Sequence, residues 1–347
     1  MAELTFRRNV LSILMPVYNE RAFLRRAVER VLAAELPRGL TKELVMVNDA
    51  STDGCERIIA EIAAANPEVV KVFHQPVNRG KGAAIQRAIA EMTGEYAIIQ
   101  DADLEYDPGD YAAVLRPLLE RHADVVYGSR FANREMRRVM FYHHKLGNLF
   151  LTHFSNFFTG LDLTDMETCY KAFRAEVLKT IPLRSERFGI EPEITAKVAK
   201  RGLTVYEVPI SYFGRGYADG KKIGWKDGFQ AIWTILKYWL IDDCFTDTAG
   251  RRHLHSYSNS RRASQALAAR FAELAAGDTI TEIDAGIGEL SRRLPRRGRL
   301  TVAEHDPECL QILRKVFADN EFVQVVDAAA DRADLLAAIP PAATVVG

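Results

Sequence analysis

Acidic residues gather at the end of one apolar run, in the stretch AIIQDADLEYDP at residues 97–108. Asp101 and Asp103 are separated by one residue, a spacing at which two carboxylates can place oxygen atoms around Mg²⁺ or Mn²⁺. Such a cation can neutralise a diphosphate. Asp is also a common turn residue, and Asp107 followed by Pro108 is typical of a helix start. Taken alone, the stretch leaves both a turn and a metal site open.

A second loop combines cations with glycines. In NRGKG, residues 78–82, Arg79 and Lys81 alternate with glycine. Such a loop at the start of a helix can bring cations and backbone N–H groups to an anion. The other interpretation is a solvated helix start without a ligand. It is disfavoured because the helix dipole opposes basic residues at this position. Glu20 and Asp49, after two other apolar runs, can accept hydrogen bonds from a base or a ribose.

Five apolar runs supply the strands that position these loops. Between them, apolar residues recur at helical spacing, as in Phe23, Ala27 and Val31. Repeated alternation of strand and helix predicts an α/β fold with a twisted, parallel sheet and helices on both faces. Because each polar loop follows the carboxyl end of a strand, we expect all of them at one edge of the sheet. The runs are residues 11–18, 43–49, 70–75, 96–100 and 123–129.

The composition is that of an ordinary soluble globular protein, with 48% hydrophobic and 27% charged residues. Lys plus Arg, 46, equals Asp plus Glu, 46, so we expect no nucleic-acid partner and only local basic surface. The four cysteines lie far apart without a C-x-x-C pair, which is typical of reduced cytosolic thiols. We expect neither a signal peptide nor a membrane-spanning segment, because no apolar run reaches the roughly 18 residues required.

The length of 347 residues predicts two domains. We place the first at residues 1–245, divided into halves at about 8–131 and 132–245. A polar, basic linker follows at 246–262. Residues 263–347 then begin a new βαβ unit.

Five ordered motifs resemble the family-2 glycosyltransferases with the glycosyltransferase A-type fold. They are SILMPVYNE, VNDASTDG, NRGKGAAIQRAI, GEYAIIQDADLEYDP and VVYGSRF. The resemblance implies a nucleotide-diphospho-sugar transferase with a Rossmann-like, mostly parallel sheet, followed by a partial second Rossmann-like unit. It implies metal-binding and catalytic roles for Asp101 and Asp103, and a catalytic phosphate contact for Arg130. It also implies a set of nucleotide-sugar-binding residues: Pro16, Tyr18, Glu20, Asp49, Lys81 and Asp101.

Three later motifs, LTDMETCYKAF, FGIEPEIT and YADGKKIGWKDG, look like the branch related to dolichyl-phosphate mannose synthase and bacterial polyprenyl-phosphate glycosyltransferases. This resemblance implies a metal-dependent, inverting transfer of a hexose from a UDP- or GDP-sugar to polyprenyl phosphate, either undecaprenyl or dolichyl.

The acceptor chemistry needs cations rather than a base. A polyprenyl phosphate is already an anionic nucleophile, so positioning and charge neutralisation can suffice. The cations that we nominate for this phosphate are Arg130, Lys171, Lys221 and Lys222. For the lysines at 221 and 222, a solvent-facing charged loop is the other interpretation. Glu191 and Glu193 are candidates for shaping the acceptor side.

Two aromatic segments, residues 149–158 and 231–241, can serve as an amphipathic surface that docks on anionic lipid, or as domain core. We expect a cytoplasmic enzyme that is peripherally associated with the inner face of the cytoplasmic membrane.

The last segment resembles the start of a class I S-adenosylmethionine-dependent methyltransferase, through EIDAGIGEL and VAEHDPE. The resemblance implies ribose binding by Glu304 or Asp306. Asp284 stands where that family usually has glycine, and the sequence stops around the fourth strand. We therefore expect a truncated, inactive module that does not bind S-adenosylmethionine.

Three other functions are alternatives to transfer onto polyprenyl phosphate. Transfer to a saccharide hydroxyl in cell-envelope polysaccharide synthesis would require a carboxylate base. A methyltransferase with a sugar-nucleotide-binding front domain is disfavoured by the missing carboxyl-terminal strands. A catalytically silent scaffold is disfavoured by the intact Asp101, Asp103 and Lys81.

Overall fold

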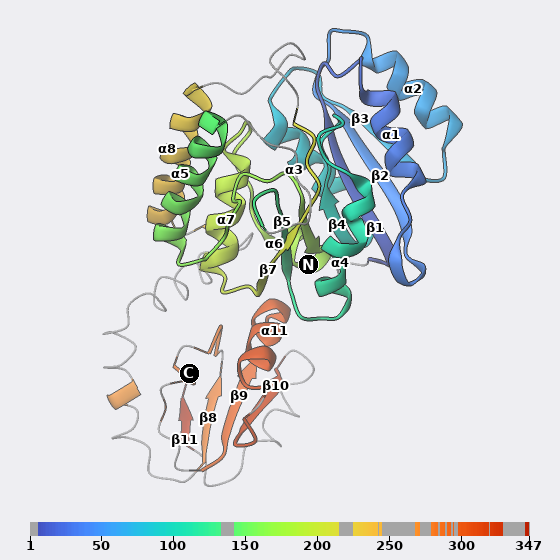
Figure 1. Ribbon diagram of the computed structural model, residues 1–347. Coiled ribbons are helices and arrows are strands. Elements are labelled where there is room, and N and C mark those ends of the chain that lie inside the picture. Colours follow the sequence, from blue (N-terminus) through green and yellow to red (C-terminus); the bar gives the residue numbers. More distant parts are fainter. Residues whose placement is uncertain are drawn as a thin grey trace. The chain divides into compact units, whose positions relative to one another are not determined.

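A computed structural model describes residues 6–132, 142–214, 225–241, 243–244, 268–270, 279–283, 285–288, 290–292, 294, 298–318, 320–328 and 344–346. The chain divides into two compact units, Met1–Thr246 and Asp247–Gly347. The division falls at the start of the polar stretch interpreted as a linker. Figure 1 shows the described elements of each unit.

The first half of unit 1 alternates strands and helices. Its strands are apolar and buried, and in β1 every residue from Val10 to Met15 is buried. Two short 3₁₀ turns, η1 (Pro37–Gly39) and η2 (Pro108–Asp110), precede β2 and α4. The elements are β1 (Arg7–Val17), α1 (Leu24–Ala33), β2 (Thr41–Asn48), α2 (Cys55–Ala65), β3 (Val70–His74), α3 (Lys81–Glu91), β4 (Gly94–Ile99), α4 (Tyr111–Leu119) and β5 (Val125–Ser129).

Among the described residues, unit 1 contains a seven-stranded sheet in the order β3-β2-β1-β4-β6-β5-β7. β1 runs parallel to β2 and β4, and β5 runs parallel to β7 (Val205–Pro209). β6 (Lys171–Arg174) is antiparallel to β4 and β5, between which it lies. The mostly parallel α/β sheet is confirmed. The sequence analysis assigned no element to β6, because a strand of this length has too few residues to establish a period of two.

The strand order reverses at β1. The chain runs outward through β2 and β3 and then returns to β4 on the other side of β1. In open α/β sheets, ligands bind beyond the carboxyl ends of the strands at such a reversal. The carboxyl ends of β1 and β4 therefore flank the expected binding crevice.

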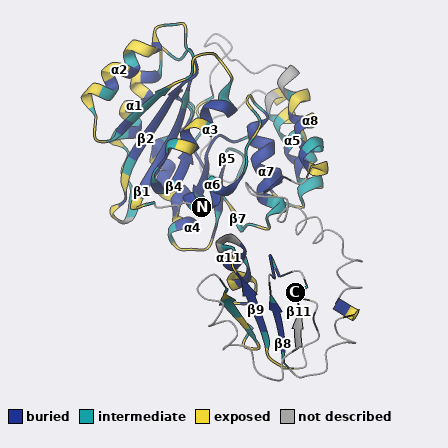
Figure 2. Cartoon of the chain, turned by 180° about the vertical axis from the view of Figure 1, so that it is seen from behind, coloured by how far each residue is buried: buried dark blue, intermediate teal, exposed yellow. Residues whose placement is uncertain are grey.

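The second half of unit 1 is mainly helical. α6 (Ala175–Thr180) follows β6, and three longer helices pack against one another: α5 (Tyr142–Thr159), α7 (Ile190–Lys200) and α8 (Trp225–Leu240). Residues 190–198 of α7 are all buried, whereas α5 and α8 have exposed outer faces, as Figure 2 shows. α7 is thus a rigid core helix that can hold a side chain in place.

The described part of unit 2 is a smaller parallel sheet, in the order β10-β9-β8-β11. Val302, Leu313 and Phe317 form its core. The two strands that the sequence predicts here are β8 and β9, which pair in parallel, but the described residues 286–288 and 290–292 between them form turns where a helix start was expected. A βαβ unit with parallel strands occurs one step later, in the β9–α11–β10 succession. The elements are β8 (Ile280–Ile283), β9 (Leu300–Glu304), α11 (Pro307–Val316), β10 (Val323–Asp327) and β11 (Thr344–Val346).

Candidate active site

Hydrogen bonds tie together the loops that follow β1 and β2. Asn19 N donates to Ser51 Oγ at 3.1 Å, and Asn19 Oδ1 accepts from Thr52 N at 2.7 Å. Asn19 has a φ of 52°, a left-handed conformation that asparagine tolerates better than most residues. Tyr18 and Glu20, two of the residues predicted to bind the nucleotide, lie in the loop after β1, and a third, Pro16, lies at the end of β1 itself. Tyr18 is 38% exposed, so its ring is accessible from the sheet edge.

Asp49 holds the next loop in place. It is buried, and its carboxylate accepts hydrogen bonds from Arg79 N at 2.8 Å, Gly80 N at 2.7 Å and Asn78 Nδ2 at 2.9 Å. These contacts fix the glycine-containing loop before α3. Nucleotide binding by Asp49 stays a prediction, because its observed hydrogen bonds stay within the protein.

Lys81 is the first residue of α3 and lies between two acids. Its Nζ is 2.9 Å from Asp101 Oδ1 and 2.9 Å from Glu191 Oε1. Burial alone would lower the pKa of this ammonium, but Asp101 and then Glu191 outweigh that cost and raise its pKa well above the ordinary value. Lys81 is therefore charged and joins the end of β4 to the start of α7.

The loop after β4 carries both aspartates of the D-x-D pair. Asp103 is buried, and its Oδ1 accepts from Glu105 N at 3.0 Å. Two hydrogen bonds join this loop to residues 211–213. Phe213 N donates to Glu105 O at 2.7 Å, and Tyr212 Oη donates to Glu105 Oε2 at 2.8 Å. The structure thus brings Lys81 and Asp101 into contact, and Asp103 lies in the same loop as Asp101.

Arg130, just after β5, is bound by Asp165. Its Nε and Nη2 donate to the two carboxylate oxygens at 2.7 Å each, and its backbone N donates at 3.0 Å. The guanidinium carbon lies 5.2 Å from the Tyr212 ring centroid. Burial opposes the charge, but Asp165 raises the pKa of Arg130 well above its ordinary value. A phosphate contact by Arg130 would use the N–H groups that Asp165 leaves over.

Lys171 occupies a different environment from the one expected for an acceptor cation. It is fully buried at the start of β6, where Nζ donates to Met166 O at 2.9 Å and to Thr168 O. Burial lowers its pKa, against the opposing effects of Glu191 and Glu167. These contacts assign Lys171 a supporting role in the 166–168 turn. Lys221 and Lys222, the other nominated lysines, lie outside the described residues.

Two buried carboxylates, Glu191 beside Lys81 and Glu167 near Glu191, each have an oxygen without a hydrogen-bond donor in the described part of the chain. These oxygens are Glu191 Oε2 and Glu167 Oε1. Burial, and next the charge of Glu191, raise the pKa of Glu167 to about 8, although Lys171 and Arg130 oppose the shift. The sequence analysis named Glu191 and missed Glu167, whose signal was only its place inside the DMETCYKAF motif.

Glu193, the other acid considered for the acceptor side, is structural. Its carboxylate accepts from Arg184 N at 2.9 Å and Ser185 N at 2.6 Å, and it pairs with Lys197 Nζ at 2.7 Å. It holds the segment that leads into α7. Within the described residues, no set of three or more His, Cys, Asp or Glu side chains is arranged to hold a metal ion.

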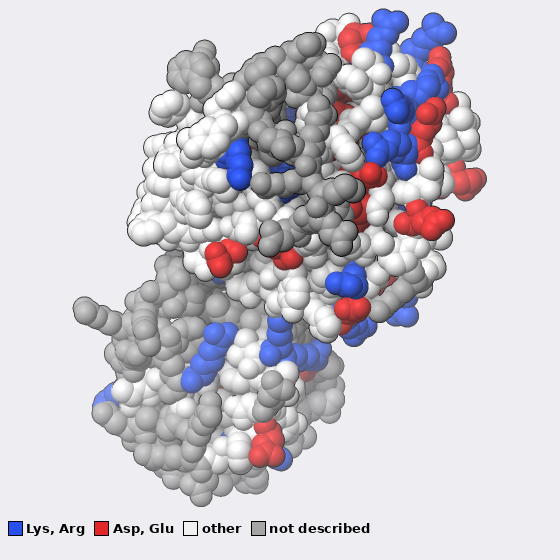
Figure 3. Space-filling view, in the orientation of Figure 1, with Lys and Arg blue, Asp and Glu red and all other residues white. Residues whose placement is uncertain are grey.

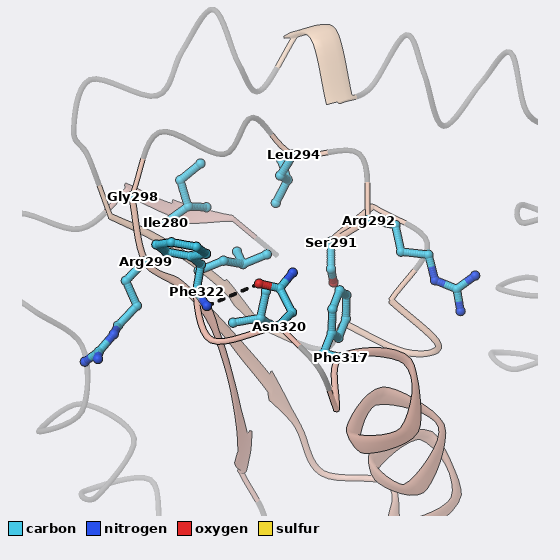
Figure 4. Close-up of a pocket in the computed structure, with 11 residues that line it drawn as sticks. Ile280, Ser291, Arg292, Leu294, Gly298, Arg299, Phe317, Asn320 and Phe322 are labelled. Atoms are coloured by element: carbon cyan, nitrogen blue, oxygen red, sulfur yellow. Dashed lines mark hydrogen bonds between the residues drawn. The ribbon is translucent and has the colours of Figure 1, made fainter.

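Unit 2 has a pocket at the opposite end of its sheet from a Rossmann-type ligand site. Ile280, Leu300 and Val323, at the amino ends of β8, β9 and β10, line it with Phe317 and Phe322 from the surrounding segments (Figure 4). Rossmann-like folds bind cofactors at the carboxyl ends of the strands. This apolar pocket is therefore not placed to hold S-adenosylmethionine.

At the carboxyl end of the same sheet, internal hydrogen bonds occupy the predicted ribose acid. Glu304 Oε2 accepts from Gly286 N at 2.6 Å, and Oε1 accepts from His305 N at 2.7 Å and Asp306 N at 2.8 Å. A ribose would have to compete with these bonds at Glu304. At Asp306, the other predicted ribose acid, Oδ1 accepts from Cys309 N at 3.1 Å, and ribose binding by either acid stays a prediction. Asp284 lies outside the described residues.

Comparison with known proteins identifies the family of unit 1. Residues 12–181 match the family model described as glycosyl transferase family 2. Polyprenol monophosphomannose synthase of Mycolicibacterium smegmatis is 30% identical over 224 residues, which cover 61% of this chain and 80% of that protein. The chain belongs to glycosyltransferase family 2.

A further relative and a solved structure extend the comparison. Glycosyltransferase AglJ of Haloferax volcanii is 32% identical over 211 residues, and the match covers 60% of this chain but only 64% of AglJ. A crystal structure of glucosyl-3-phosphoglycerate synthase from Mycobacterium tuberculosis, in complex with Mn²⁺ and UDP, aligns with a TM-score of 0.52 at 20% identity. That alignment covers 67% of this chain and 81% of the other, and it establishes the shared fold.

Proposed function

We propose that this family-2 chain transfers a hexose from a UDP- or GDP-sugar to polyprenyl phosphate, with inversion and with a divalent metal. The observation that carries the proposal is the contact of Lys81 with Asp101, the first acid of the D-x-D pair, in the loop after β4 beside the strand-order reversal. The relative named for a polyprenol phosphate product, 30% identical over most of its length, supports this acceptor class.

The carboxylates suit a metal that is shared with the substrate. Mg²⁺ and Mn²⁺ are commonly held by one or two carboxylates, with the rest of the coordination sphere supplied by phosphate oxygens and water. Asp101 and Asp103 would be those carboxylates. When bound, the metal would neutralise charge on the departing nucleoside diphosphate.

The chain's own cations add to this neutralisation. Lys81 would contact the diphosphate from the start of α3. Pro16 at the end of β1, Tyr18 and Glu20 in the loop that follows, and Asp49 after β2 would hold the nucleoside. Because Asp165 holds Arg130 rigidly, its unused N–H groups present a preorganised positive surface. Such a surface fits the acceptor phosphate, which needs no base to become nucleophilic. Lys221 and Lys222 stay candidates for the same phosphate.

A saccharide hydroxyl is the second acceptor candidate, because of one observation. Glu167 and Glu191 are close enough for Glu191 to raise the pKa of Glu167, to about 8. A carboxyl with such a pKa is a better proton acceptor than an ordinary one, and a hydroxyl acceptor requires a base. For the methyltransferase alternative, Glu304 offers no support, because its carboxylate accepts hydrogen bonds from within unit 2.

We also propose that the protein works at the cytoplasmic face of a membrane, peripherally attached. No helix within the described residues has the length and apolarity to cross a bilayer. None of the four cysteines, all within the described residues, forms a disulfide bond, which accords with a reducing compartment.

The outer faces of α5 and α8 fit the surface of an anionic bilayer. Both helices expose apolar stripes at helical spacing, opposite their buried faces. Between the helices, the ring centroids of Phe158 on α5 and Trp239 on α8 lie 5.1 Å apart. The region over α5 and α8 is largely free of charged residues in Figure 3. The stripes are Tyr142, Leu146, Phe150 and Phe157 on α5, with Phe229, Trp233 and Leu240 on α8.

Charge favours lipid over a second copy of the chain as the occupant of this face. α5 contains no Asp or Glu but has Lys145 and three histidines, and α8 ends near Lys237. Aromatic and apolar residues flanked by basic groups are typical of helices that lie in the interface of an anionic bilayer.

The reaction can be tested with radiolabelled UDP-glucose and GDP-mannose, Mg²⁺ or Mn²⁺, and undecaprenyl phosphate or a soluble saccharide. We expect metal-dependent label in the organic phase, and a loss of at least about 100-fold in Asp103→Asn. Asp107→Asn is the matched control, because Asp107 lies in the same loop but pairs with Arg30 on α1 at 2.9 Å. Label in the saccharide alone would replace the lipid acceptor, and label in neither phase would contradict both acceptors.

A further inference from the structure

We infer that Glu191 is a positioning residue for Lys81, and that it keeps this ammonium in the site when a metal and a diphosphate take Asp101. The inference rests on the proposed function for the identity of that ligand. It concerns a residue that contacts Lys81 and is not itself assigned a contact with the donor.

The contacts form a single bridge of three charges. Lys81 Nζ lies 2.9 Å from one oxygen of Asp101 and 2.9 Å from one oxygen of Glu191. The Glu191 side chain is only 8% exposed, compared with 23% for Asp101. Lys81 thus has one acid that faces the ligand site and one that is fixed in the protein interior.

The scaffold holds both ends of the Lys81–Glu191 pair. Ala83 N, in the first turn of α3, donates to Glu186 O at 2.9 Å, and Gln86 Nε2 donates to Ser185 O at 2.9 Å. Glu193 anchors the same segment through Ser185 N. One backbone and one side-chain hydrogen bond therefore join the first part of α3 to the segment that leads into α7, and they help to set the separation of Lys81 and Glu191.

Electrostatics then assigns the two acids different parts. A divalent cation at Asp101 repels the Lys81 ammonium and competes with it for the carboxylate. Glu191 stays behind as a partner, so Lys81 can release Asp101 without moving into solvent. Held by Glu191, the Lys81 ammonium is within reach of an anionic ligand beside Asp101. Without the charge of Glu191, the ammonium would depend on Asp101 alone and would compete more strongly with the metal.

The test measures binding of Mn²⁺ alone, and of UDP or GDP with Mn²⁺, to the full chain by titration calorimetry. We expect Glu191→Gln to weaken nucleotide binding about 10-fold, the size of effect found for directly contacting charged pairs. Glu191→Asp, which keeps the charge, should recover part of the loss. Glu186→Gln is the matched control, because it removes the same charge from an exposed pair with Arg79 in the adjacent segment.

A double-mutant cycle distinguishes positioning from a structural effect. In a Lys81→Met background, Glu191→Gln should cause little further loss of binding, since the group that it positions is gone. Additive losses, or binding by Glu191→Gln equal to that of the wild type, would overturn the inference. Thermal unfolding of each variant identifies any loss of fold. If Glu191→Gln does not fold, Glu191→Asp is compared with the wild type in its place.

The outcomes for the reaction are separate. Weakened nucleotide binding in Glu191→Gln, without transfer by the wild type to any acceptor, would support the positioning role and contradict the proposed reaction. Transfer by the wild type with unchanged binding in Glu191→Gln would do the reverse. A wild type that binds neither nucleotide would contradict both.

Discussion

The cations at the candidate site are already neutralised by acids. Lys81 is shared by Asp101 and Glu191, and Arg130 is held in a bidentate pair by Asp165. Free cations would attract any anion, whereas paired cations favour a ligand that brings its own counterion. A metal–diphosphate would meet that condition, because a metal held by Asp101 would replace Lys81 as the partner of this carboxylate.

Glu167 predicts a pH dependence of stability. Its pKa is raised from the ordinary 4.5 to about 8 by burial and by Glu191, with Lys171, Arg130 and Asp165 also facing it. Between these values the folded state keeps a proton that the unfolded state releases. The free energy of unfolding therefore falls as the pH rises through this window.

Glu167→Gln should remove that dependence. From about pH 5 to about pH 8, the variant should lose less stability than the wild type, by at most about 1.4 kcal/mol for each pH unit. Urea unfolding of both proteins across this range measures the difference. Parallel stability curves would show that Glu167 does not titrate in the window.

At the scale of elements, close packing of α3 on residues 185–187 positions Lys81. Gly80 has a φ of 99°, and a Cβ on Gly82 would overlap the carbonyl oxygen of Ser185. The two glycines in the NRGKG motif therefore permit the approach of a neighbouring backbone. This is a different reason from the phosphate-cradling role that the sequence pattern indicates.

Gly82→Ala should destabilise the protein by about 1–3 kcal/mol, because the backbone of α3 or of Ser185 must shift. Gly147→Ala in α5 is the matched control: no atom lies within 4 Å of the added Cβ, and alanine favours a helix, so stability should rise by up to about 1 kcal/mol. Chemical denaturation of the two variants checks the opposite signs. Equal effects would contradict the packing argument.

At the scale of the whole molecule, the chain combines a family-2 unit with a second parallel α/β unit of unassigned role. Unit 1 contains the candidate site and the apolar face of α5 and α8. α7 contacts both of these helices and also carries Glu191. The candidate site is thus one helix layer from the proposed membrane face, which suits an acceptor whose phosphate stays close to its bilayer.

The membrane proposal predicts selective binding to anionic vesicles. The wild type should co-sediment with phosphatidylglycerol-containing vesicles more than with pure phosphatidylcholine, and less so at high salt. Replacing Phe229 and Trp233 together by serine should weaken binding at least about 10-fold, because two exposed apolar side chains are lost. Tyr206→Ser, at an exposed aromatic residue on β7, is the control. Unchanged sedimentation of the double variant would exclude this face.

The sequence by itself determined the alternation of strands and helices, the edge at which the polar loops meet, and the family. Apolar periodicity and short motifs are local properties, and parallel strands bring their carboxyl ends together whatever the side-chain contacts. Asp101 and Lys81, adjacent in the structure, were recognised in this way.

Only the tertiary structure decided how the charges pair. Lys171, expected at the acceptor phosphate, is inside the core because β6 inserts antiparallel between β4 and β5. Glu191 contacts Lys81, and Glu167 interacts with Glu191, from positions far along the chain. Such pairings depend on long-range packing and on the cost of burying a charge without a partner, which no local pattern records.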